Sequence, residues 1–197
     1  RIALQVATQT SDLTAAIQFS EHLLQAAPDN LENYTIAGRA ILKSGDPIKA
    51  IKIVEAGLTI ADDATLLRLG LEAARESRDH AWIMTLGTRL IEQNPEHECL
   101  IEYRKALRST GLREHALQIS QKIVEQSDTP TQDDIGELFS DHIVLGDINS
   151  ALQVAKQTNL LSSEEQDRVK QLVQVKSQKQ LDESDKKLLQ RTQIFSQ

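Results

Sequence analysis

The sequence has few of the residues that build disulfide scaffolds or β-sheets. Its 197 residues include one cysteine, four prolines, eight glycines and only 3% aromatics. Cys99 stands alone, which excludes an intrachain disulfide and a thiolate metal cluster. Scarce turn residues argue against a many-turned β-sandwich or barrel, and a core with so few aromatics must consist almost wholly of Leu, Ile, Ala and Val. We therefore expect an all-α protein.

Charge and hydropathy exclude two further classes. The formal net charge of −7 disfavours nucleic acid or an anionic bilayer as a partner of the whole molecule. No apolar run approaches the roughly 18 residues that a membrane-spanning helix needs, so we expect no membrane insertion. The chain begins at Arg1 without a signal-peptide pattern. The compartment is left open, with the cytoplasm slightly favoured.

A pattern of small and bulky residues recurs along most of the chain. It is clearest just after Pro28, where bulky and small side chains follow each other at helical spacing around a Gly-Asp turn: Tyr34, Ala37, Gly38, Ile41, Gly45, Asp46, Ala50 and Val54. This pattern resembles the tetratricopeptide repeat, in which each unit is a pair of antiparallel helices. The resemblance implies a right-handed superhelical solenoid of such helix pairs, also called an alpha-alpha superhelix.

The repeat continues in both directions along the chain. In the resembled family, the second helix of each unit has a position for a small residue. Residues that match this position recur at spacings of 34, 33, 33 and 35 residues: Ala16, Ala50, Ile83, Ala116 and Ala151. A turn precedes each of them: Ser11-Asp12, Gly45-Asp46, Arg78-Asp79, Gly111-Leu112 and Gly146-Asp147. Three of these turns contain glycine, which permits the left-handed backbone that ends a helix. Helix-ending and capping residues predict units at about 1–30, 31–63, 64–96, 97–130 and 131–160.

Two units depart from the pattern, and the end of the chain has a different one. The unit 64–96 has Ile83 and Gly87 where a small and a large residue are expected, so we expect its helices to pack with altered spacing. The first unit holds only half of its leading helix, which indicates a piece of a longer protein. We expect residues 161–197 to form a C-terminal capping helix or helices and a tail.

The capping segment begins with a recognisable helix start. Ser162 and Glu165 have the spacing of a capping box, ahead of a narrow apolar stripe formed by Val169, Leu172 and Val173. Ser184–Phe195 is expected to form another helix, which either docks or leads into a further domain.

The sequence contains little that indicates catalysis. The five histidines show no paired metal-ligand spacing, and there is no phosphate-binding loop and no nucleophile elbow. His97-Glu98-Cys99 comes nearest to a metal cluster, but an exposed histidine beside an inward cysteine explains it better. We expect no catalytic residue, no metal site and no cofactor, and therefore no enzyme. Trp82 is interpreted as partly buried packing, with an anchor for a partner as the alternative.

The resemblance implies a concave groove lined by one face of each unit's first helix. Six positions on that face are basic: Arg39, Lys43, Arg68, Arg75, Lys105 and Arg108. One interpretation is a positive groove for an acidic peptide, a C-terminal carboxylate or a sugar-phosphate chain, bound through charge-assisted hydrogen bonds. The alternative is an ordinary solvated face, on which these bases pair with neighbouring acids: Glu32, Glu72, Glu76 and Glu98.

The function that follows is a non-catalytic protein-interaction scaffold, which binds a protein or peptide segment in the groove. The alternative is an accessory or regulatory segment of a larger multidomain enzyme, such as a bacterial glycosyltransferase or a surface-polysaccharide assembly protein. The carboxylate clamp of some tetratricopeptide co-chaperones is absent, since its positions hold Thr35, Arg39, Leu69, Glu98 and Glu102. Uncapped repeat faces tend to pair with a second copy of the chain, so a homo-oligomer is a further alternative.

Overall fold

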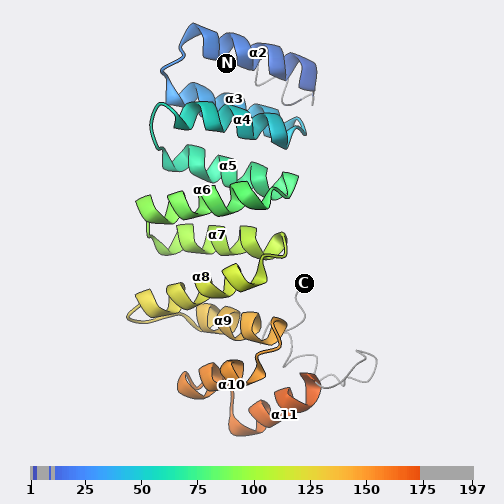
Figure 1. Ribbon diagram of the computed structural model, residues 1–197, viewed down its shortest axis with the longest axis vertical. Coiled ribbons are helices and arrows are strands. Elements are labelled where there is room, and N and C mark those ends of the chain that lie inside the picture. The colour runs from blue at the N-terminus through green and yellow to red at the C-terminus, as the bar shows by residue number, and fades with distance from the viewer. Residues whose placement is uncertain (1, 4–8, 10–11, 174–197) are drawn as a thin grey trace. The chain divides into compact units, whose positions relative to one another are not determined.

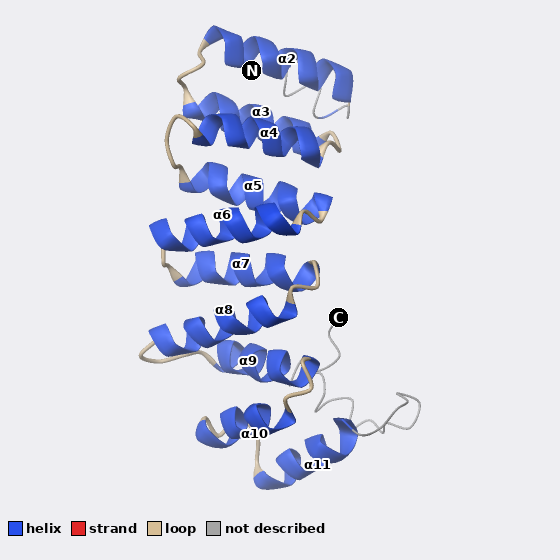
Figure 2. Ribbon diagram, in the orientation of Figure 1, coloured by secondary structure: helices blue, strands red, loops and turns tan. Residues whose placement is uncertain are grey.

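The computed structural model describes residues 2–3, 9 and 12–173. Within this part of the chain the regular secondary structure is entirely α-helical, which confirms the expected all-α class (Figure 1 and Figure 2). Short turns join the described helices: α2 (Leu13–Ala26), α3 (Leu31–Lys43), α4 (Pro47–Leu58), α5 (Ala64–Ser77), α6 (His80–Gln93), α7 (His97–Ser109), α8 (Arg113–Gln126), α9 (Gln132–Val144), α10 (Ile148–Gln157) and α11 (Ser163–Val173). None of these helices is long and apolar enough to cross a membrane.

The chain divides into two compact units, Arg1–Gly111 and Leu112–Gln197, which we call the N-terminal unit and the C-terminal unit. In the N-terminal unit each helix from α2 to α7 packs against the next one along the chain. The alternate helices α3, α5 and α7 also pack against one another in succession. In the C-terminal unit, neighbour packing links α8 to α9, α9 to α10 and α10 to α11. The division falls inside the predicted repeat unit 97–130.

Aspartates begin four of the helices that follow the predicted turns. Asp12, Asp46, Asp79 and Asp147 are the N-cap residues of α2, α4, α6 and α10. Each carboxylate accepts a hydrogen bond from the backbone N–H three residues later, at 2.9–3.1 Å. These bonds satisfy backbone donors that have no partner inside the helix. At α10 the donor is Ser150, and its hydrogen bonding lowers the pKa of Asp147.

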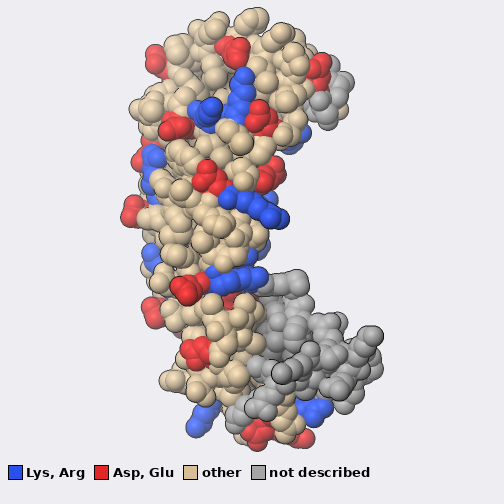
Figure 3. All heavy atoms as spheres, turned by 45° about the vertical axis from the view of Figure 1, so that its right-hand side comes forward, with Lys and Arg blue, Asp and Glu red and all other residues tan. Residues whose placement is uncertain are grey.

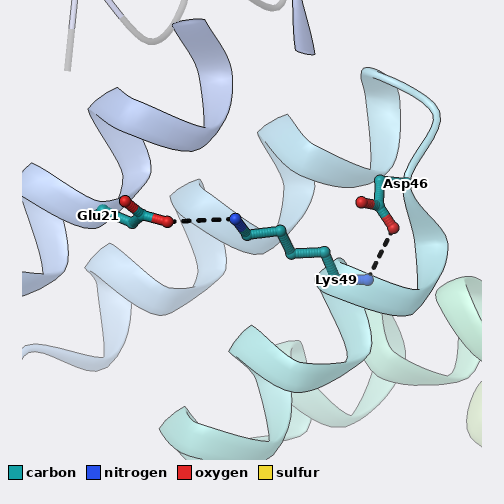
Figure 4. Close-up of polar contacts among 3 residues, drawn as sticks. All are labelled: Glu21, Asp46 and Lys49. Carbon is teal, nitrogen blue, oxygen red and sulfur yellow. Dashed lines mark hydrogen bonds and ion pairs between the residues drawn. The ribbon is translucent and has the colours of Figure 1, made fainter. Parts of the chain in front are cut away.

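The cap of α4 also shows how consecutive helix pairs are joined at the surface (Figure 4). Asp46 accepts from the backbone N–H of Lys49 at 2.9 Å, and the Lys49 side chain forms an ion pair with Glu21 of α2 at 3.2 Å. Both side chains are partly exposed, so this pair stabilises the packing by at most about 1 kcal/mol.

At four of the predicted turns, the first turn residue has a left-handed backbone conformation that ends the preceding helix. Gly45, Gly111 and Gly146 have φ values of 94°, 84° and 79°, which confirms the role expected of these glycines. Arg78 takes the same conformation at φ 55° without being glycine. The chain can then reverse and start the next helix at once, because the following residue is its N-cap.

The small-residue positions of the repeat lie in the core. Ala16, Ala50, Ile83, Ala116 and Ala151 are all 0% exposed. Ile83 is thus accommodated at a position where the other four units have alanine.

Glycines allow the closest approaches between helices of the N-terminal unit. A Cβ atom added to Gly70 would lie 2.7 Å from Leu86, and one added to Gly38 would lie 3.0 Å from Leu69. The tightest case is Gly87, where an added Cβ would lie 2.2 Å from the ring of Tyr103. Gly87, which lacks the large side chain expected there, therefore admits an aromatic ring from α7.

The C-terminal unit has its own apolar cluster, which includes the start of the predicted cap. It consists of buried side chains from α9, α10, α11 and the turn before α11: Phe139, Ile143, Ala151, Ala155, Leu161 and Val169. The expected capping box is present, since the Ser162 N–H donates to Glu165 at 2.8 Å and the Glu165 N–H donates to Ser162 at 3.3 Å.

Several expectations fall outside the described residues. They concern the side chains of Leu172 and Val173, the helix expected within Ser184–Phe195, and most of the leading half-helix at residues 1–7.

The contact at Gly87 generates a stability prediction. In Gly87→Ala the new methyl group must displace the Tyr103 ring, and overpacking of this kind costs about 1–3 kcal/mol. The gain in helix propensity, about 1 kcal/mol, offsets only part of this cost. We expect a lower free energy of unfolding than for the wild type, measured by urea denaturation.

Gly136 of α9 provides the matched control. It is a buried helical glycine, but an added Cβ would meet no atom within 4 Å. Gly136→Ala should therefore stabilise the chain by up to about 1 kcal/mol. Equal effects of the two substitutions would contradict the close contact between Gly87 and Tyr103.

Candidate binding pocket

The N-terminal unit contains a pocket of about 370 Å³ formed by the alternate helices α3, α5 and α7. Helix α5 contributes the largest share of its lining, with α3 and α7 on its two sides. The lining comprises charged, polar and aliphatic side chains: Arg39, Thr65, Arg68, Leu69, Leu71, Glu72, Arg75, Glu102, Lys105 and Ala106.

Helical spacing explains why these residues share one surface. On α5, Thr65, Arg68, Glu72 and Arg75 are three or four residues apart, which places them along one face of the helix. Leu69 on the same helix is only 3% exposed. It lies in the lining together with the equally buried Ala106 of α7. The pocket therefore combines an aliphatic floor with charged walls.

The structure brings together four of the six predicted basic residues. Arg39, Arg68, Arg75 and Lys105 all line the pocket. Lys43 and Arg108 lie about one helical turn further along α3 and α7 and do not line it. Leu69 and Ala106, which form the aliphatic floor, were not among the predicted site residues. Each of them directly follows a predicted basic residue in the sequence.

Arg68 is held by residues of α7. Its Nη2 donates a hydrogen bond to the Sγ of buried Cys99 at 3.2 Å and lies 3.6 Å from a Glu98 carboxylate oxygen. Its Nε lies 3.2 Å from a Glu102 carboxylate oxygen. These contacts, with the Cys99 hydrogen bond the largest contribution, raise the pKa of Arg68. Arg68 is therefore paired with neighbouring acidic side chains, as the alternative interpretation of the basic face predicts.

The other three cations of the pocket are in a different situation. Arg39, Arg75 and Lys105 are exposed, and none forms an ion pair with any part of the chain that the structure describes. They come from three helices, α3, α5 and α7 respectively. Glu72 is likewise exposed, with no ion pair among these residues.

The pocket therefore has a charge opposite to that of the chain. It contains four cations and two carboxylates, a balance of +2, whereas the net charge of the chain is −7. On the face displayed in Figure 3, the described Lys and Arg side chains lie among Asp and Glu side chains. The arrangement can bind an anionic group through charge-assisted hydrogen bonds.

The segment His97-Glu98-Cys99 combines exposed and buried side chains. His97 is exposed, whereas Cys99 is 1% exposed and accepts the Arg68 hydrogen bond. Within the described residues no group of three or more His, Cys, Asp or Glu side chains could hold a metal ion. Trp82 is half-buried near the start of α6.

The fold is similar to solved structures of MamA. One crystal structure of MamA shares 16% sequence identity with this chain, covering 78% of it and 85% of the MamA chain, with a TM-score of 0.59. A second covers 85% and 95% at 16% identity and the same TM-score of 0.59. A MamA RS-1 double mutant covers 85% and 92% at 13% identity, with a TM-score of 0.57.

These likenesses identify the type of fold. MamA is a helical repeat protein of the tetratricopeptide type, and the chain accordingly has a tetratricopeptide-like solenoid fold built from helix pairs. No protein-family model matches the chain, and no curated protein matches it in sequence.

The contacts of Arg68 predict a measurable coupling across α5 and α7. In a double-mutant cycle of Arg68→Gln and Glu102→Gln, we expect a coupling energy of about 0.5–1 kcal/mol, because both side chains are partly exposed. The cycle is measured by urea denaturation. The control cycle of Lys43→Gln with Glu102→Gln should give no coupling, since Lys43 lies outside the pocket. Equal coupling in the two cycles would contradict a stabilising ion pair between Arg68 and Glu102.

Proposed function

We propose that this chain is a non-catalytic binding module that holds an acidic protein or peptide segment in the pocket between α3, α5 and α7. The observation that supports this most directly is the presence of Arg39, Arg75 and Lys105 in one pocket without ion-pair partners among the described residues. In an acidic chain, three such cations are available to a ligand from outside.

The chemistry of the lining favours a peptide. Leu69 and Ala106 offer an apolar surface to aliphatic parts of a ligand, while the cations bind its charged groups. Pockets that combine an apolar floor with a few polar groups are typical of specific binding sites. Arginine is well suited to carboxylates, because its planar guanidinium donates two parallel hydrogen bonds to them.

The proposal does not involve a reaction. Thr65 provides the single hydroxyl of the pocket lining among the described residues, and the lining has no histidine beside it to act as a base. The geometry thus supports recognition of a charged group.

The test uses the 197-residue chain and an array of acidic, neutral and basic peptides of about ten residues. We expect acidic peptides to be retained. The triple variant Arg39→Gln, Arg75→Gln, Lys105→Gln should bind the strongest acidic peptide about 100-fold more weakly, measured by fluorescence anisotropy. These cations are exposed, so each lost charge pair costs up to about 1 kcal/mol, and about 1.4 kcal/mol is tenfold in affinity.

A second triple variant controls for net charge. Lys43, Lys52 and Lys156 are exposed and lie outside the pocket, so changing all three to Gln removes the same charge from other surfaces. This control should bind like the wild type. A preference for neutral or basic peptides, or equal losses in both triple variants, would refute the proposal.

A further inference from the structure

We infer that the pocket recognises a phosphorylated serine or threonine side chain of its peptide ligand. This inference rests on the proposed function, because it specifies the anionic group that the same pocket binds. It follows from the size of the pocket, its charge balance and the distribution of its unpaired cations.

The size of the pocket limits how the ligand can distribute its charge. At about 370 Å³ it lies near the lower end of the roughly 300–1,000 Å³ that is typical of ligand pockets. A pocket of this size accommodates one side chain with its flanking backbone more readily than a row of acidic residues. This volume therefore favours a ligand whose negative charge is concentrated on one group.

The charge balance indicates how much charge that group has. Within the lining Arg68 is paired with Glu102, while Glu98, which also contacts Arg68, is exposed and lies outside the lining. This leaves Arg39, Arg75 and Lys105 against Glu72, a surplus of +2 in the lining. A single Asp or Glu side chain supplies a charge of only −1. A phosphate monoester supplies about −1.5 to −2 near pH 7. The phosphate thus matches the surplus within one side chain.

The positions of the unpaired cations are consistent with a phosphate monoester. These cations lie on three successive alternate helices, α3, α5 and α7, and all three line the same pocket. A phosphate ester has three acceptor oxygens, one for each cation, whereas a carboxylate has two. Arg39 and Arg75 can also bind two oxygens each, because arginine forms bidentate pairs with phosphate.

Arg68 has a different role in this arrangement. Its contacts with Cys99 and Glu102 place it as a positioning residue that joins α5 to α7. The distance between these helices determines how far Arg75 lies from Lys105. We therefore expect Arg68→Gln to weaken phosphopeptide binding less than Arg75→Gln.

The experiment uses four oriented peptide libraries with random flanking positions and a fixed phosphoserine, serine, aspartate or glutamate. The immobilised 197-residue chain should retain the phosphoserine library about tenfold or more over the aspartate and glutamate libraries, as expected for additional charged hydrogen bonds. Free phosphoserine should compete with the retained peptides. Changing Arg39, Arg75 and Lys105 to Gln should abolish the preference, and the Lys43, Lys52 and Lys156 control should keep it.

The outcomes separate this inference from the proposed function. Equal retention of the phosphoserine, aspartate and glutamate libraries, lost in the pocket triple variant, would overturn the phosphate inference and leave the acidic-peptide proposal standing. Retention of no acidic library would overturn both. Competition by glucose 6-phosphate as strong as that by free phosphoserine would overturn the assignment to a peptide. Unchanged thermal unfolding of both triple variants would exclude loss of folding as the cause of lost binding.

Discussion

Close packing of alternate helices is the constraint on which the pocket depends. Helix α5 packs against both α3 and α7, and glycines permit the short distances in this region. The side chain of Leu69, which forms part of the pocket floor, lies against Gly38 of α3. A larger residue at position 38 would displace Leu69 or separate the helices, and either change would alter the floor. The site is thus a consequence of how the repeat packs.

The same packing explains why one cation is paired and others are not. Arg68 of α5 donates a hydrogen bond to Cys99, which is 31 residues later in the sequence. Cys99 lies near the start of α7, the first helix of the next predicted repeat unit. This hydrogen bond, together with the ion pairs to Glu98 and Glu102, joins α5 to α7. Arg39, Arg75 and Lys105 find no such partner in the described residues, so their charges remain available at the surface of the pocket.

Each level of structure adds a different element to this arrangement. Aspartate caps and left-handed turns make the helices start and stop at regular intervals, and small buried residues let the helices approach one another. Regular stacking then repeats one helix face along α3, α5 and α7. Cations on each of these helices therefore line one pocket, and this arrangement is the basis of the proposed anion binding.

The sequence by itself determined the local structure of this protein. Its turns at Gly45, Gly111 and Gly146, its capping box at Ser162 and Glu165, and its all-α class were predictable, because dihedral preferences and caps depend on residues close in the chain. The resemblance to the tetratricopeptide repeat predicted that Arg39, Arg68, Arg75 and Lys105 share one groove-lining face. Only the tertiary structure decided that Lys43 and Arg108 lie outside the pocket, that Tyr103 covers Gly87 and that Arg68 is paired. These features depend on distances between helices, which are set by side-chain packing across about 15 to 40 residues of sequence and not by any local pattern.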